Sequence, residues 1–161
     1  MNQFLYWFII TTNAIIYPLQ TDKYYYYKHY FLEVITMNFP AELKYTKDHE
    51  WLKYEGNVAV VGISDFAQDA LGDLVFVNLP QIGDSVTAGE AFGDVESVKA
   101  VSDLNSPVTG VVCAINEELV DSPELLNSDC YGAWIIKVEN VTAEEELLDS
   151  VAYEAFCAEE G

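Results

Sequence analysis

One lysine, Lys99, stands alone among acidic side chains in the middle of the chain. Between Tyr54 and Ile136 it is the only lysine or arginine, while 14 aspartate and glutamate residues share that stretch. Surface lysines are normally interspersed with acids, and this distribution does not fit that pattern. A lone primary amine is what a protein needs when one amine is to be modified and no other. Lys99 is therefore predicted to be a site of covalent modification that carries a chemical group.

The residues on both sides of Lys99 predict a β-hairpin that would present the lysine at its tip. Apolar and β-branched residues favour strands over residues 92–98 and 101–105. We expect Lys99 and Ala100 to form the two-residue loop, although this pair lacks the Asn and Gly that such loops prefer. The register of the hairpin follows from this choice of loop.

In this register Glu96 lies opposite Asp103, and Val95 lies opposite Leu104. Side chains alternate across a strand, so Val95 and Leu104 face inward while Glu96 and Asp103 face outward. Two carboxylates directly opposite each other are unfavourable. We interpret the acidic pair as a recognition mark or as the partner of a bound cation; the alternative is that the pair merely follows the acidic surface.

The rest of the chain predicts a small domain built mainly from short strands. The helix expected at residues 64–72 begins at Ser64 as N-cap and ends at Gly72. The tail has helical spacing over residues 143–148 and 151–156. Short strands with few helices indicate a single mainly β domain over residues 37–161. The remaining strands are expected at residues 50–54, 58–61, 74–77, 111–116 and 133–138.

The charge of the chain excludes nucleic acid as a partner. Seven lysines, no arginine and 27 acidic residues give a formal net charge of −20, so the phosphates of nucleic acid would be repelled. Partners with basic patches fit this surface better. A hydrophobic fraction of 51% argues against disorder.

The residues that could perform catalysis are sparse. The three cysteines, Cys113, Cys130 and Cys157, are odd in number and lack metal-ligand spacing, which predicts reduced, incidental thiols. No pattern of nucleophile and base or of metal ligands is present, so we expect neither an enzyme nor a metal site.

Residues 1–36 differ in composition from the remainder and are close to neutral, with two lysines, one aspartate and one glutamate. Their apolar run is short for a membrane span and lacks the marks of a signal or transit peptide. We interpret them as an upstream or non-native extension without a stable fold, with Met37 as the true start. The alternative is a weak membrane-facing anchor. The expected location is the cytoplasm.

Several blocks of residues follow one another between Phe39 and about Glu160: Leu43–Tyr45, His49–Trp51, Val61–Ile63, Ala67–Gln68, Leu71–Val77, Leu79–Pro80, Val95–Ala100, Ser106–Gly110, Asn116, Ser122–Asn127 and Gly132–Trp134. In this order they resemble the glycine cleavage H-protein family. The segment from Val95 to Ala100 is similar to the lipoylation motif of that family. A lone Val-Lys-Ala would be weak evidence, whereas this many blocks in sequence are specific.

The resemblance implies that Lys99 carries lipoic acid as an amide and that the protein is a carrier rather than an enzyme. It also implies a flattened barrel-sandwich hybrid of two antiparallel sheets, with the lysine on a hairpin tip and a C-terminal helix. The implied partners are a pyridoxal-phosphate glycine decarboxylase, a tetrahydrofolate-dependent aminomethyltransferase, a dihydrolipoyl dehydrogenase and a lipoate ligase or lipoyl transferase.

Three further residues take roles from the resemblance. Glu50 and Asp103 match acids of the cleft that receives the loaded arm, where carboxylates would hold a cationic aminomethyl group. Glu96 matches the residue that the lipoylating enzyme reads. His49 is interpreted as a structural polar contact, because no nucleophile accompanies it.

Other carriers fit the sequence less well. A biotin carrier would have methionines beside the lysine, where this chain has Val98 and Ala100. A lipoyl domain of a 2-oxoacid dehydrogenase usually has an acidic residue before the lysine and a linker to a catalytic domain. A protein that serves mainly as lipoyl donor in a relay remains an open alternative, because the same lysine would do both jobs.

Overall fold

The computed structural model describes residues 37–160, and the predictions for the segment 1–36 lie outside these residues. The described part contains nine strands and four helices, of which α5 near the C-terminus is the longest helix. No helix in this part is long and apolar enough to cross a membrane.

The larger sheet has six strands in the order β1-β2-β3-β9-β8-β5, and its neighbouring strands run antiparallel. Its first hairpin turns at Gly56, whose φ of 66° places it in the left-handed region that glycine tolerates. The strands are β1 (Lys44–Tyr45), β2 (Glu50–Glu55), β3 (Val58–Ile63), β5 (Ser85–Val86), β8 (Val108–Ile115) and β9 (Ile136–Glu144).

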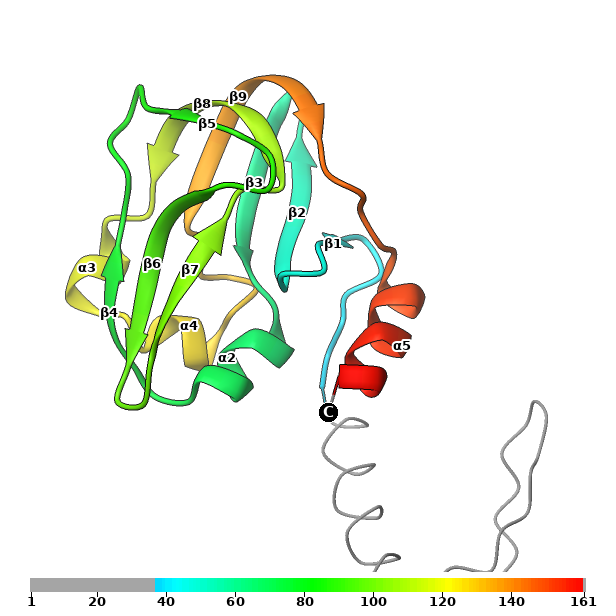
Figure 1. Ribbon diagram of the computed structural model, residues 1–161. Coiled ribbons are helices and arrows are strands. Elements are labelled where there is room, and N and C mark those ends of the chain that lie inside the picture. Colours follow the sequence, from blue (N-terminus) through cyan, green and yellow to red (C-terminus); the bar gives the residue numbers. More distant parts are fainter. Residues whose placement is uncertain (1–36, 161) are drawn as a thin grey trace, which may run out of the picture. The chain divides into compact units, whose positions relative to one another are not determined.

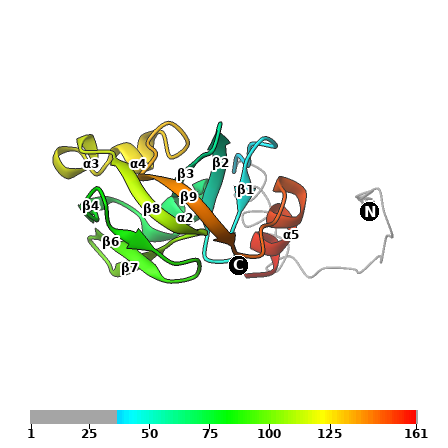
Figure 2. The same cartoon turned by 90° about the horizontal axis from the view of Figure 1, so that it is seen from above.

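The smaller sheet consists of β4 (Leu74–Asn78), β6 (Ala91–Ser97) and β7 (Val101–Asn105), in the order β4-β6-β7 and again antiparallel. It lies across one side of the larger sheet (Figures 1 and 2). Buried side chains from both sheets form one hydrophobic core, among them Leu52, Val61, Val77, Val95, Leu104 and Val138. The predicted fold class, two antiparallel sheets with short helices and a C-terminal helix, is confirmed.

A second core lies where helix α5 (Ser150–Glu160) packs beside β1 (Figure 1). The rings of Tyr45 and Tyr153 stack with centroids 4.4 Å apart, and both residues are fully buried. Cys157 is buried in the same cluster, and all three cysteines of the chain are free thiols. This second core fixes the C-terminal helix to the start of the domain.

Helix α2 (Asp65–Leu71) has the ends that the sequence predicts. The Ser64 hydroxyl accepts a hydrogen bond from the amide of Ala67, and Gly72 ends the helix with a φ of 75°. The two remaining helices, α3 (Glu118–Asp121) and α4 (Leu125–Ser128), are single turns beyond β8. Neither turn was predicted, and the same is true of the two-residue strands β1 and β5.

The helix predicted over residues 143–148 is wrong. Ala143 and Glu144 instead end β9, where they pair with Thr109 and Val108. Leu148 exchanges backbone hydrogen bonds with Tyr45. The glutamates of this segment favour a helix locally, but pairing with distant strands satisfies the backbone in extended form. The helix expected over residues 151–156 is confirmed as part of α5.

Gly93 on β6 leaves room for the backbone of the neighbouring strand. A β-carbon at this position would lie 2.2 Å from the carbonyl oxygen of Asn78, whereas a β-carbon at Gly56 would meet no atom within 4 Å. Since a backbone atom cannot move aside as a flexible side chain can, β4 and β6 would have to separate.

We predict that Gly93→Ala lowers the free energy of unfolding by about 3 kcal/mol. Gly56→Ala, the matched control, should cost only about 1 kcal/mol, since it meets the left-handed backbone penalty without a clash. Urea denaturation followed by circular dichroism measures both. Equal losses in the two variants would contradict the close approach at Gly93.

Candidate functional site at the lysine hairpin

Lys99 lies at the tip of the β6–β7 hairpin and is exposed, as predicted, but the loop begins one residue earlier than expected. Glu96 pairs with Val101, and the amide of Ser97 donates to the carbonyl of Ala100 at 2.8 Å. The two loop residues are therefore Val98 and Lys99, and the predicted loop of Lys99 and Ala100 is wrong.

Ser97 explains why this tight turn needs neither Asn nor Gly. Its hydroxyl oxygen accepts hydrogen bonds from the amides of Lys99 and Ala100, each at 3.2 Å. No residue of the loop has positive φ, so the turn is not of the primed type that Asn-Gly favours. A serine side chain closes the loop in place of special backbone geometry.

The observed register changes which residues pair across the hairpin, but each side chain stays on the face of the sheet that was predicted. Asp94 faces Asp103 and Val95 faces Ser102, so the predicted Glu96–Asp103 and Val95–Leu104 pairs do not form. The observed register differs by two residues, and an even shift preserves which side chains point inward. Val95 and Leu104 are accordingly buried, and Asp103 is exposed.

The Lys99 side chain passes over the C-terminal end of α2. A β-carbon placed on Gly72 would lie 3.4 Å from Lys99 Nζ. The carbonyl end of a helix carries partial negative charge, which favours a cation there. Within residues 37–160, Lys99 makes no ion pair, whereas Lys47, Lys53 and Lys137 each pair with a glutamate. Its amine is therefore accessible and uncommitted, as attachment of an acyl group requires.

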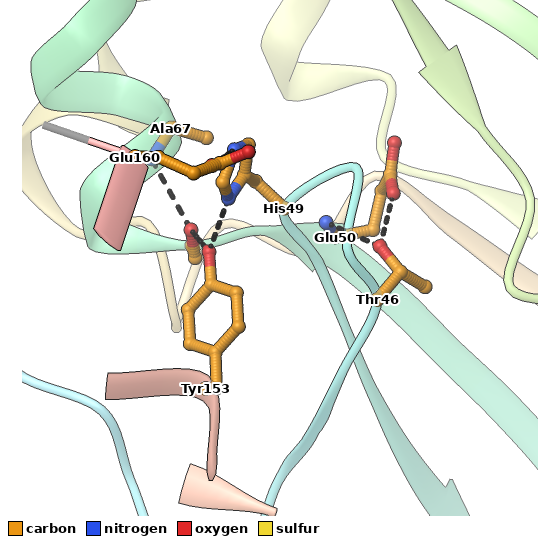
Figure 3. A network of polar contacts seen from close by, with 7 residues as sticks. Thr46, His49, Glu50, Ala67, Tyr153 and Glu160 are labelled. Carbon is orange, nitrogen blue, oxygen red and sulfur yellow. Dashed lines mark hydrogen bonds and ion pairs between the residues drawn. The ribbon is translucent and has the colours of Figure 1, made fainter. Parts of the chain in front are cut away.

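Glu50 lies at the other end of the site, where its carboxyl group joins the two sheets. It starts β2 of the larger sheet and is only 2% exposed. One carboxyl oxygen accepts a hydrogen bond from the backbone amide of Asn105 on β7 at 2.8 Å. The other accepts from the Thr46 hydroxyl, which in turn accepts from the amide of Glu50 (Figure 3).

Burial raises the pKa of Glu50 to about 7, although the hydrogen bonds from Thr46 and Asn105 oppose this shift. Asp48 adds to the increase because its negative charge lies nearby. A buried carboxylate without a cationic partner is unfavourable, so the group retains its proton to higher pH. A cation placed beside this carboxylate would favour its ionised form.

His49 has a structural role, as predicted. Its φ of 77° is unusual for a residue with a side chain. Nδ1 lies 2.8 Å from the Tyr153 hydroxyl, and Nε2 lies 3.0 Å from a carboxylate oxygen of Glu160 (Figure 3). The Tyr153 hydroxyl also contacts Ser64, the N-cap of α2. Helix α5 therefore holds the backbone on which Glu50 is placed.

The structure divides the predicted site residues between two ends of β7. Glu96 lies beside Lys99 near the tip, whereas Glu50 contacts Asn105 at the far end. Asp103 lies between them on the outward side of the strand. Within the described residues, no hydrogen bond or ion pair involves the side chains of Glu96 or Asp103, and no cluster of potential metal ligands is present.

Sequence reasoning missed the residues that position these groups. Thr46 and Asn105 hold the Glu50 carboxyl group, and Ser97 closes the hairpin. Only Ser97 has a recognisable signal, since serine commonly bonds to backbone amides two residues on. The contact with Asn105 joins residues 55 positions apart and has no local pattern.

We predict that the Glu50→Gln variant removes a step in the pH dependence of stability. The folded state binds the Glu50 proton more tightly than the unfolded state, so stability falls as pH rises from 4.5 to about 7 and is then level. Relative to Glu50→Gln, which mimics the protonated group, the wild type should lose about 3 kcal/mol across this window. Chemical denaturation at pH 4.5, 6 and 8 measures the difference. Parallel profiles for the two proteins would contradict the raised pKa.

Comparison with known proteins supports the resemblance to the glycine cleavage H-protein family over most of the chain. The family model of the glycine cleavage H-protein matches residues 43–160. The glycine cleavage system H protein of Acidobacterium capsulatum is 52% identical over 126 residues, covering 77% of this chain and 98% of that protein. The one from Carboxydothermus hydrogenoformans is 53% identical over 125 residues, covering 76% and 96%.

A solved structure agrees with the architecture. The crystal structure of a glycine cleavage system H protein from Mycobacterium marinum has a TM-score of 0.68 and 43% sequence identity, covering 73% of this chain and 97% of that one. The chain therefore belongs to the glycine cleavage H-protein family, whose members are non-catalytic lipoyl carriers of the glycine cleavage system.

Proposed function

We propose that Lys99 is the residue that bears the lipoyl group and that the arm delivers its cargo to a site formed by Glu50 and Asp103. The observation that supports this most strongly is the position of Lys99. It is exposed on a two-residue loop, and it is the only lysine or arginine between Tyr54 and Ile136. Within this stretch of the sequence, a modifying enzyme therefore finds no second lysine that could be modified in place of Lys99.

The residues around Lys99 fit an acylated lysine. Ser97 holds the turn and Gly72 leaves room beside the side chain, so the amine extends from a rigid base. Acylation removes the ammonium charge, and no ion pair within the described residues is lost by it. A lipoyl amide supplies a dithiolane that carries a group between separate active sites.

Glu50 and Asp103 would receive an aminomethyl group, which is cationic at neutral pH. The Glu50 carboxyl group is buried, and burial raises its pKa. A cation beside it would lower that pKa and form a charge-assisted hydrogen bond. Asp103 lies on the outward side of β7, on the way from Lys99 to the Asn105 that contacts Glu50.

Membership of the glycine cleavage system implies partners on both sides of the carrier step. We assign the loading step to a pyridoxal-phosphate glycine decarboxylase and the unloading step to a tetrahydrofolate-dependent aminomethyltransferase. A dihydrolipoyl dehydrogenase would reoxidise the dithiol, and a lipoate ligase or lipoyl transferase would read Glu96 and modify Lys99. The three free cysteines suit a reducing compartment, which supports the cytoplasm as location.

We predict that the protein purified from cells with lipoate gains one lipoyl group, and that Lys99→Arg abolishes the gain. Lys44→Arg is the matched control, because Lys44 is also exposed and also makes no ion pair within the described residues. Intact mass spectrometry with peptide mapping measures the adduct. A lipoyl group on any other lysine would contradict the assignment.

A second assay separates glycine cleavage from a lipoyl relay. The lipoylated protein should stimulate glycine-dependent exchange of bicarbonate by purified glycine decarboxylase. Modification at Lys99 without stimulation would instead favour the relay.

A further inference from the structure

The tip of the β6–β7 hairpin contacts the short connection between α2 and β4, which consists of Gly72 and Asp73. The amide of Val98 donates to the carbonyl of Asp73 at 3.3 Å. A β-carbon placed on Gly72 would lie 3.4 Å from Lys99 Nζ and 3.7 Å from Lys99 Cε, so the lysine side chain lies beside the backbone of this connection. The position of the connection therefore helps to set the direction in which Lys99 leaves the hairpin.

One side chain, that of Asn127, bonds to the backbone on both sides of Asp73. Its Oδ1 accepts from the amide of Leu74 at 3.0 Å, and its Nδ2 donates to the carbonyl of Gly72 at 2.9 Å. A backbone amide can only donate, so Oδ1 must face Leu74, and this fixes the orientation of the side-chain amide. Asn127 thus holds the connection with one acceptor and one donor, as a neighbouring strand would.

Asn127 is itself well supported. It belongs to the single turn α4, which lies next to α2 (Figure 1). The preceding residue, Leu126, is fully buried in the core. The half-buried side chain of Asn127 also donates from Nδ2 to Oε1 of Gln68 at 3.1 Å. These contacts keep the side chain in one place and make it a rigid support for the connection.

The contacts of Asn127 extend further than the end of a helix requires. The amide of Gly72 already closes the end of α2 by donating to a carbonyl of that helix. Asn127 also holds Leu74, the first residue of β4, and Leu74 pairs with Ser97, whose hydroxyl closes the loop at the hairpin tip. Asn127 is therefore linked to the tip along two paths, one through the connection and one through β4.

We propose that Asn127 is a positioning residue for Lys99, which fixes the connection beside the lysine and so directs the acyl arm toward Glu50. This inference rests on the proposed function of Lys99 and Glu50. An arm that extends from a fixed base has fewer conformations to lose when its end reaches Glu50, so delivery of the cargo is favoured. A mobile base would remove this advantage without changing the chemistry at Lys99.

Hydrogen exchange of the Val98 amide, followed by two-dimensional NMR, tests whether Asn127 fixes the connection. Asn127→Ala removes both backbone contacts, so this amide should exchange about tenfold faster than in the wild type. Asn127→Asp keeps the volume and the acceptor for Leu74 but loses the donor, and it should also accelerate exchange. It decides the question alone if Asn127→Ala does not fold.

Asn116→Ala is the matched control. The side-chain amide of Asn116 is also half-buried, but it donates to the carbonyl of Trp134, at 2.9 Å, rather than to the connection. Its removal should leave exchange at Val98 within about twofold of the wild type.

A second measurement follows the arm itself. The pKa of Glu50 is measured by carbon-13 NMR in each lipoylated protein, before and after loading with the aminomethyl group by glycine and glycine decarboxylase. The unloaded proteins should share one midpoint. Loading should lower the midpoint in the wild type and in Asn116→Ala, and the decrease should be about half as large in both Asn127 variants.

Unchanged exchange at Val98, or an equal decrease on loading in the wild type and the Asn127 variants, would overturn the proposal. A different midpoint in the unloaded Asn127 variants would also overturn it, because Asn127 would then act on Glu50 rather than on the lysine. A wild-type protein whose midpoint does not change on loading would instead refute the proposed role of Glu50, and this proposal with it.

Discussion

Glu50 carries a carboxyl group that is buried between the two sheets and accepts hydrogen bonds from both sides. The Thr46 hydroxyl reaches it from the loop after β1, and the Asn105 amide reaches it from β7. A buried charge without a cationic partner is unfavourable, so stability alone does not explain an acid at this position. The arrangement is consistent with the proposal that the carrier places a cationic aminomethyl group beside this carboxylate.

β7 links this buried acid to Lys99, the proposed lipoylation site. Its last residue, Asn105, contacts Glu50. Its first residue, Val101, comes two positions after Lys99 in the chain. Helix α5 supports the same region from behind, through contacts of Tyr153 with His49 and Ser64. The lysine thus lies on a hairpin whose base is held by hydrophobic contacts and also by the hydrogen bond between Asn105 and Glu50.

Much of this arrangement could be predicted from the sequence where a local pattern exists. Alternation placed Val95 and Leu104 inward, and the charge distribution singled out Lys99. The register was wrong by two residues because the Ser97 hydroxyl closes the turn, which a preference for Asn-Gly loops does not reveal.

Contacts between distant residues were beyond sequence reasoning. The segment 143–148 favours a helix locally but pairs with β8 and β1. In the same way, the contact between Glu50 and Asn105 depends on how two sheets meet, and no periodicity encodes it.

The most direct test of this account is the pKa of Glu50, measured by carbon-13 NMR of its carboxyl group before and after the carrier is loaded with the aminomethyl group. We expect a midpoint near 7 in the unloaded protein and a clear decrease on loading, because a cation favours the ionised form. A midpoint near the ordinary value of 4.5 in the unloaded protein, or no change on loading, would contradict the account.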